Sequence, residues 1–327
     1  MEHGNFSSLY SNDNKIEFVV DGFNKDAKTT EKFDKVKKII FLTFAYLFLI
    51  FLAFIMMIPF YWMLITSLKS EVVNGNYVGL SNDFFIPFNE IAWNNYAIIF
   101  DPSRFDFFNY LINTFIVLII STIGTLFVTI FAAFAFTRLQ FKGRDTTFYI
   151  YLITMMIPSE LFVASNFITV YRYGLLNDRW GTYFAIMLPF IVNVFYIYLL
   201  RESFKQIPEE LYLASKVDGK SDWKYLWKVM VPIASPTLIT ITILKVISTW
   251  NAYAWPKTVT VANSEYTLIT VGIRDIANFD SNIGGFLFTL QSLQMAATVI
   301  ITIPLILLFI FFRKYIMSGT SRTGIKG

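Results

Sequence analysis

The chain has 327 residues, of which 55% are hydrophobic, 15% are charged and 36 are phenylalanine. This apolar fraction exceeds that of soluble domains and indicates membrane-spanning segments. The sequence contains no cysteine, and its one histidine is His3, which excludes disulfides, thiolate metal sites and most catalytic pairs of a nucleophile and a base. The net charge of +4 is small, so the placement of Lys and Arg says more than their total.

Residues 1–38 form a tail that is rich in both Lys and acidic residues. We expect this tail to be mostly disordered or peripheral, with a short strand at 16–20 as the alternative. Six segments beyond it are long and apolar enough to cross a bilayer of about 30 Å, which takes roughly 20 helical residues. They lie at 39–65, 110–136, 148–171, 181–200, 231–255 and 290–312. We therefore predict an all-α, multi-pass membrane protein with six transmembrane helices.

The distribution of positive charge predicts the orientation of these spans. Lys and Arg are concentrated in the segments that share one side with the two termini, and they are sparse in the loops at 68–109 and 256–289. The positive-inside rule therefore places both termini in the cytoplasm. The first span follows a charged tail that has no small-residue cleavage site, so it is a retained span and not a signal peptide. Both outer loops have room for short helices.

A polar stretch separates the fourth and fifth spans, within the loop 201–230. Over residues 207–219 it reads Ile-Pro-Glu-Glu-Leu-Tyr-Leu-Ala-Ser-Lys-Val-Asp-Gly. Pro208 suits the first position of a helix, and Glu209 and Glu210 favour the positive end of its dipole. Four residues at positions i, i+3, i+4 and i+7 share one face and form a small-residue patch: Leu211, Ala214, Ser215 and Asp218.

The pair Asp218-Gly219 is expected to end this helix, because glycine tolerates left-handed backbone geometry. Ser221 then caps a second helix, whose apolar stripe consists of Trp223, Leu226, Trp227 and Met230. One interpretation is a hairpin that lies on the inner leaflet, which suits the Trp-rich second helix. The first helix is too acidic and too small-faced for a membrane anchor, and we expect it to enter a groove on a cytoplasmic protein.

The segment 207–219 resembles the EAA loop of the permease subunits of ABC importers. Gly219 matches the glycine of that loop. Further matches narrow the resemblance to the smaller permease subunit of maltose-type carbohydrate importers, and they run in order over roughly residues 39–327. They are Asn113-Thr114-Phe115, 132–138, 141–144, Met156-Ile157-Pro158, 173–178, Thr249-Trp250-Asn251, Trp255-Pro256, Tyr266-Thr267-Leu268 and the Gly-rich ending 318–327. The resemblance implies a type I ABC importer permease fold, in which the EAA loop docks on an ATPase.

The resemblance also implies a division of the chain. Residues 1–38 are a cytoplasmic tail, 39–107 the first transmembrane helix and an outer loop, 108–312 the core permease domain with the coupling loop 201–230, and 313–327 a second cytoplasmic tail. The residues expected to couple the chain to the ATPase are Glu209, Glu210, Leu211, Ala214, Ser215, Asp218 and Gly219. One departure is Leu213, which stands where the family has the Glu of its loop. Glu209 and Glu210 are expected to substitute for that charge.

The same loop contains a misleading pattern. Residues 214–221 read Ala-Ser-Lys-Val-Asp-Gly-Lys-Ser and differ from a phosphate-binding loop only in the first glycine. Such a loop follows a strand, so that its backbone N–H groups surround the phosphates, and no strand is expected here. We therefore expect no cofactor in this chain, with ATP-Mg held by separate ATPase subunits.

Two charged residues fall within predicted spans, where ionisable groups are costly and mark functional sites. Glu160 follows Pro158, which is expected to kink the third span beside a cavity. Lys245 precedes Trp250 and Asn251 in the fifth span. We expect these five residues to line a translocation pathway, because carboxylates, amides and aromatic rings suit sugars. Alternatively, the charges pair with a partner subunit and the aromatic residues form an interfacial belt.

These observations favour a non-enzymatic permease subunit of a sugar or oligosaccharide importer in the bacterial cell membrane. Its expected partners are a second homologous permease, an ATPase dimer, an extracellular solute-binding protein and the lipid bilayer, with no nucleic acid. An ion- or proton-coupled secondary transporter is the alternative, which Glu160 alone supports thinly and which the lack of an inverted repeat disfavours. A membrane enzyme is the third possibility.

Overall fold

The computed structural model of the protein describes residues 13–261, 263–275, 279–283 and 285–321. Its contacts divide the chain into two compact units, Met1–Trp62 and Met63–Gly327. Most of α1 (Asp13–Ser67), a continuous helix, lies in the first unit. The segment Val36–Ser67 is apolar enough to cross a membrane and contains the predicted first span. Its large apolar side chains are exposed around the helix, as suits a helix that faces lipid.

Residues 16–20 belong to α1, so the alternative of a short strand at this position is wrong. The sequence that follows is rich in Lys, which favours a continuous helix over the isolated alternation at 16–20. Residues 13–38 are likewise helical and not disordered. The rest of the predicted tail, residues 1–12, lies outside the described residues.

The second unit contains two further long helices, α3 (Phe107–Arg138) and α14 (Gln291–Ser321). Both are apolar enough to cross a membrane, over Phe107–Arg138 and Gln291–Lys314. These helices contain the predicted second and sixth spans, apart from the first residue of the sixth. Pro304 lies inside α14.

The other three predicted spans are bent pairs of helices. The third joins α4 (Arg144–Thr154) to Ser159–Arg172, which comprises a 3₁₀ turn and α5 (Val163–Arg172), at 86°. The fourth joins Arg179–Phe190, which begins with α6 (Arg179–Met187), to α7 (Val194–Lys205) at 56°. The fifth joins Asp222–Ile233, with α9 (Asp222–Tyr225) and α10 (Val231–Ile233), to α11 (Ser235–Trp250) at 77°. It thus differs from the predicted range 231–255, since its first half includes residues 222–230 of the predicted coupling loop and its second half ends at Trp250. With each bent pair as one span, the described residues contain six spans.

Proline accounts for the positions of these bends. Pro158 directly precedes the turn at Ser159–Phe162, which confirms the predicted kink of the third span. Pro189 lies in the 3₁₀ turn that ends the first half of the fourth span, and Pro232 and Pro236 flank the bend of the fifth. Proline lacks a backbone N–H and clashes with the preceding helical turn, so it breaks the hydrogen-bond ladder at these points.

The loops at 68–109 and 256–289 contain the expected short helices and, in addition, two antiparallel ribbons. The helices are α2 (Asn94–Ile99), α12 (Ala254–Thr260) and α13 (Ile269–Arg274). The first ribbon pairs β1 (Val72–Val73) with β2 (Asn76–Tyr77), and the second pairs β3 (Asp280–Ile283) with β4 (Phe286–Thr289). Asn74 and Gly75 both have positive φ, 53° and 79°, which is the geometry of a tight hairpin turn. This Asn-Gly signal was available in the sequence.

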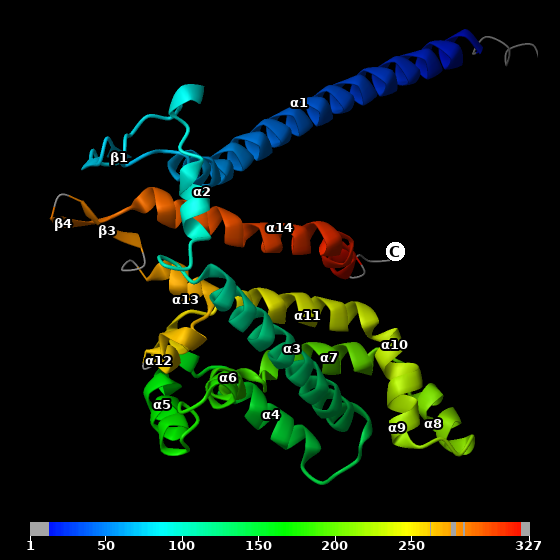
Figure 1. Ribbon diagram of the computed structural model, residues 1–327. Coiled ribbons are helices and arrows are strands. Elements are labelled where there is room, and N and C mark those ends of the chain that lie inside the picture. The colour runs from blue at the N-terminus through cyan, green and yellow to red at the C-terminus, as the bar shows by residue number, and fades with distance from the viewer. Residues whose placement is uncertain (1–12, 262, 276–278, 284, 322–327) are drawn as a thin grey trace, which may run out of the picture. The chain divides into compact units, whose positions relative to one another are not determined.

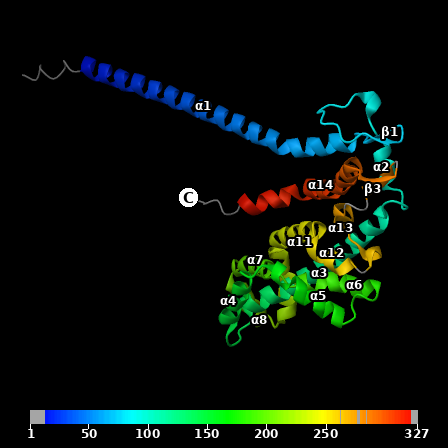
Figure 2. The same cartoon turned by 90° about the vertical axis from the view of Figure 1, so that its left-hand side faces the viewer.

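The second unit is built around α3, with α7 and α11 beside it (Figures 1 and 2). One buried cluster joins α3 and α7 to α9 and the segment after it, through Phe134, Leu200, Phe204 and Tyr225 among others. A second joins α3 to α6 and α12, and a third joins α2 and α13 to α14. The polar hairpin is therefore packed directly on α3.

Candidate coupling hairpin and central cavity

The predicted polar helix is α8 (Glu209–Val217), and α9 follows it after a short turn. Pro208 is the residue before the helix, with φ −54° and ψ 138°, so the helix begins one residue later than expected. Ser221 caps α9 as predicted, since its Oγ accepts a hydrogen bond from the Lys224 N–H. We call residues 208–230 the coupling hairpin.

The turn after α8 has the geometry of a Schellman motif. Gly219 has a φ of +70°, a left-handed conformation that side chains other than glycine and asparagine resist. Its N–H donates to the Lys216 carbonyl at 3.0 Å, and the Lys220 N–H donates to the Ser215 carbonyl at 2.9 Å. These two bonds satisfy carbonyls that the helix end would otherwise leave open.

Three side chains tie α8 to the start of α9. The Tyr212 hydroxyl donates to Asp222 Oδ1 at 2.7 Å, and Lys216 Nζ lies 2.8 Å from the same oxygen. The hydrogen bond to Asp222 raises the pKa of Lys216 above its usual range. Burial, together with the bond to Asp222, raises the pKa of Tyr212. Both groups therefore stay protonated at neutral pH and hold the hairpin closed.

Three residues of the predicted small-residue face of α8 are exposed, and the fourth, Ser215, is not. Ser215 is buried, at 5% exposure, and its Oγ donates to the Tyr212 carbonyl inside the hairpin. Its side chain is therefore not on the exposed part of α8, and its role in coupling stays a prediction. The exposed residues at i, i+3, i+4 and i+7 are Glu210, Leu213, Ala214 and Val217. Of the other predicted coupling residues, Glu209, Leu211, Asp218 and Gly219 are also exposed.

An arginine that was not among the predicted site residues holds the base of the hairpin. Arg138, the last residue of α3, donates through Nη2 to the Ile207 carbonyl at 2.5 Å and to the Phe204 carbonyl at 3.4 Å. Ile207 directly precedes Pro208. The end of α3 is thus hydrogen-bonded to the chain at the point where the coupling hairpin begins.

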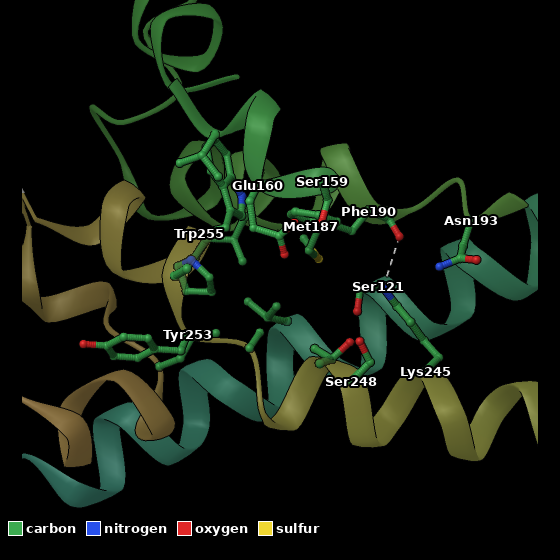
Figure 3. A pocket seen from close by; sticks show the side chains of 18 of the residues that line it. Ser121, Ser159, Glu160, Met187, Phe190, Asn193, Lys245, Ser248, Tyr253 and Trp255 are labelled. Atoms are coloured by element: carbon green, nitrogen blue, oxygen red, sulfur yellow. Dashed lines mark hydrogen bonds between the residues drawn. The ribbon is translucent and has the colours of Figure 1, made fainter. Parts of the chain in front are cut away.

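A cavity of about 310 Å³ lies among α3, α6, α11, the turn at Ser159–Phe162 and the segment 252–256. We call it the central cavity. Glu160 and Lys245 both line it, and they approach from opposite sides in Figure 3. Its other polar lining groups include Ser121, Asn193, Ser248 and Tyr253. The structure therefore brings together two of the five residues predicted for a translocation pathway.

Lys245 is buried, at 6% exposure, within the apolar helix α11. Among the described residues its Nζ has one hydrogen-bond partner, the Phe190 carbonyl at 3.2 Å, and no carboxylate partner. Phe190 stands where the fourth span breaks, so this bond satisfies a carbonyl that lacks a helical donor. A lysine at the centre of a membrane helix costs roughly 2.5–3.5 kcal/mol on insertion scales, and one neutral carbonyl offsets only part of that cost.

The other predicted pathway residues lie elsewhere. Pro158 makes the bend of the third span but does not line the central cavity. Trp250 is buried against Phe115, with ring centroids 5.7 Å apart. Asn251 follows the end of α11 and donates to the Ile247 carbonyl at 2.9 Å. Trp250 and Asn251 line a separate cavity of about 290 Å³ beside α13 and α14.

The fold and these two sites define a multi-pass membrane subunit of a transport system. The family described as binding-protein-dependent transport system inner membrane component matches residues 126–322, more than half of the chain. The chain belongs to this family. Its members are non-catalytic ABC transporter permeases, and ATP hydrolysis lies in a separate subunit.

Relatives match more than four fifths of the chain. The arabinooligosaccharides transport system permease protein AraQ of Bacillus subtilis is 27% identical over 288 residues, which is 86% of this chain and 94% of the relative. The lactose transport system permease protein LacG of Rhizobium radiobacter is 28% identical, over 82% of this chain and 90% of the relative. These matches support the importer and not the secondary transporter.

A solved structure supports the fold independently. It is that of a bacterial ABC transporter involved in the import of the acidic polysaccharide alginate, with a TM-score of 0.70 and 24% identity. The match covers 84% of this chain and 96% of the other. The six-helix fold of type I ABC permeases is therefore the fold of this chain. Among the described residues, no group of three or more His, Cys, Asp and Glu side chains could hold a metal ion.

Proposed function

We propose that this chain is one of two permease subunits of an ATP-driven importer for a sugar or oligosaccharide in the bacterial cell membrane. Family membership supports the importer class, and the names of the relatives support a carbohydrate substrate. The partners are a second homologous permease, a dimer of ATPase subunits that bind ATP and Mg²⁺, and an extracellular solute-binding protein. The termini and the coupling hairpin face the cytoplasm.

The observation that carries the proposal is the coupling hairpin. Its first helix ends in a fixed turn, is locked to α9 by Asp222, and leaves an apolar and acidic face exposed. An exposed face held this rigidly suits insertion of a short helix into a groove on the ATPase. Leu213, which replaces the Glu of the family loop, lies on that face at 57% exposure.

The contacts of the hairpin suggest how its movement reaches the cavity. Closure of the ATPase dimer displaces α8, and the bond from Arg138 to the Ile207 carbonyl passes that displacement to α3. Since α3 and α11 pack together and both line the central cavity, the cavity opens to alternate sides of the membrane. In this mechanism Glu160 and Lys245 contact the passing sugar.

The test is ATP hydrolysis by the purified complex of both permeases and the ATPase in proteoliposomes. We expect the solute-binding protein loaded with its sugar to stimulate hydrolysis and to drive uptake of that sugar. Ala214→Trp should leave the chain inserted at normal levels but abolish both effects, because a bulky side chain on the exposed face prevents α8 from seating in the groove of the ATPase. The proposal fails if no carbohydrate stimulates hydrolysis or if uptake follows an ion gradient without ATP.

A further inference from the structure

The ammonium group of Lys245 is enclosed in the central cavity without a negative partner. Among the described residues, its only hydrogen bond is the one to the neutral Phe190 carbonyl at 3.2 Å. An ammonium group carries three donors. Two donors and nearly the full positive charge therefore remain available to whatever occupies the cavity.

The groups that surround Lys245 in the cavity add further donors. The Asn193 side-chain oxygen accepts a hydrogen bond from the Tyr196 N–H at 3.2 Å, which fixes the amide and directs its NH₂ group toward the cavity in Figure 3. The Ser248 hydroxyl lines the same cavity beside Lys245, as does that of Ser121, which donates to the Leu118 carbonyl at 3.4 Å (Figure 3). A cation with an amide N–H and a hydroxyl is a donor set suited to an oxyanion.

Glu160 is the carboxylate of this cavity, and it does not neutralise the lysine. It lies on the turn at Ser159–Phe162, is exposed, and approaches from the side opposite Lys245. No ion pair joins the two groups. The cavity consequently has a buried cationic end and an exposed anionic side, and an anionic ligand would be drawn to the buried end.

We infer that the central cavity is a subsite for the carboxylate of a uronic acid, so that the transported carbohydrate is an acidic oligosaccharide. This inference rests on the proposed function, because it specifies which sugars pass through the same cavity. Neutral sugars would leave the charge of Lys245 without compensation at the step where water is displaced. A uronate would supply the missing charge and accept the free donors.

The experiment measures uptake of two radiolabelled trisaccharides by the complete importer, with its solute-binding protein, in phosphatidylcholine proteoliposomes. One trisaccharide is built of galacturonate and the other of galactose, so that they differ in charge but hardly in size. The neutral lipid removes anionic headgroups as a competing occupant of the cavity. The variants are Lys245→Gln and Lys245→Met, which remove the charge at similar length, and Lys245→Arg, which keeps it.

We expect the wild-type importer to take up the galacturonate trisaccharide with the lower KM. A charged hydrogen-bonded contact contributes roughly ten- to hundredfold in affinity, so Lys245→Gln and Lys245→Met should raise that KM about ten- to hundredfold. Uptake of any neutral sugar that the importer accepts should be unchanged, and Lys245→Arg should retain the preference. The matched control Lys314→Gln, which removes an exposed lysine at the end of α14, should alter neither.

Three results would overturn the inference while leaving the proposed function intact. In the first, the wild type imports only the galactose trisaccharide. In the second, Lys245→Gln and Lys245→Met change the uptake of both sugars equally or of neither. In the third, size-exclusion chromatography shows that these two variants fail to assemble. The last result would make Lys245 a structural support of the break at Phe190. An importer that carries no carbohydrate at all would instead refute the proposed function itself.

Discussion

The backbone at Gly219 has a φ of +70°, and a side chain built there would meet no atom within 4 Å. The demand for glycine is therefore conformational and not steric. Forcing a β-branched residue into this left-handed conformation costs about 1–2 kcal/mol. That cost is too small to unfold a six-span bundle, but it is large enough to change the angle at which α8 leaves the turn.

We predict that Gly219→Val assembles normally yet loses sugar uptake or separates it from ATP hydrolysis, because α8 no longer fits its groove. The matched control is Gly219→Asn, since asparagine tolerates left-handed geometry and should retain most activity. Uptake and ATP hydrolysis are measured on the same reconstituted complexes. Full, substrate-dependent uptake by Gly219→Val would show that this turn does not transmit force.

Arg138 is a second residue whose substitution should impair uptake, although it lies outside the central cavity and the exposed face of α8. In Arg138→Gln the Ile207 carbonyl loses the guanidinium donor, at a cost of roughly 1–3 kcal/mol, whereas the Phe204 carbonyl still accepts from the Ile207 N–H. A shift of that size changes a coupled equilibrium about 5- to 150-fold. We expect ATP hydrolysis to persist while uptake falls at least tenfold. Lys142→Gln, an exposed change in the neighbouring loop, is the control, and equal uptake by the two variants would contradict the role of Arg138.

For single residues, the sequence showed which side chains are unusual, but not which groups they contact. Lys245 and Glu160 were identifiable because charges in apolar spans are conspicuous. The side of α8 that Ser215 faces was not, because it depends on how α9 folds back. Arg138 was not predicted as a site residue for the same reason, since its carbonyl partners lie 66 and 69 residues further along the chain.

At the scale of elements, the coupling hairpin behaves as one unit because Tyr212 and Lys216 share Asp222. The folded pKa of Lys216 is raised, so its contribution is fully present below the pKa of the unfolded chain and is lost as the pH rises through the folded value. The pKa of Tyr212 is also raised, and its hydroxyl remains a donor. Titration of these two groups therefore does not weaken the hairpin between pH 6 and pH 9.

We predict that hydrogen exchange of the amides in 209–225, corrected for the intrinsic rate, is independent of pH between 6 and 9. Asp222→Asn should speed exchange in this segment across the whole range, because it removes the ion pair and weakens the Tyr212 bond. Asp218→Asn, which removes only the exposed pair with Lys220, should change exchange much less. If protection of these amides from exchange declines within this range, or survives Asp222→Asn, then Tyr212, Lys216 and Asp222 do not hold the hairpin closed.

Element boundaries were predictable where proline or glycine stands at them, as at Pro158 and the Asp218-Gly219 turn. The ribbons β1–β2 and β3–β4 were not predicted, because strands of two to four residues leave almost no periodicity. The angles of the bends in the third, fourth and fifth spans could not be predicted from the sequence either. A proline shows that a helix is interrupted, whereas the angle depends on the helices packed around it.

At the scale of the whole molecule, the six spans follow from hydropathy and length, but their orientation depends on the positive-inside rule alone. The natural lack of cysteine makes this orientation testable. Two exposed positions suit single cysteines. Ser221 caps α9 in the coupling hairpin, and Asn282 lies in β3.

We predict that Asn282→Cys reacts with a membrane-impermeant maleimide in intact cells, because its loop is on the outer side. Ser221→Cys should react only after the membrane is permeabilised, because the hairpin is cytoplasmic. Labelling of both variants in permeabilised cells is the control for access, and uptake of the substrate shows that each variant still functions. Since an even number of spans separates the two termini, rapid labelling of Ser221→Cys in intact cells would reverse the orientation of the entire chain and remove the hairpin from any ATPase.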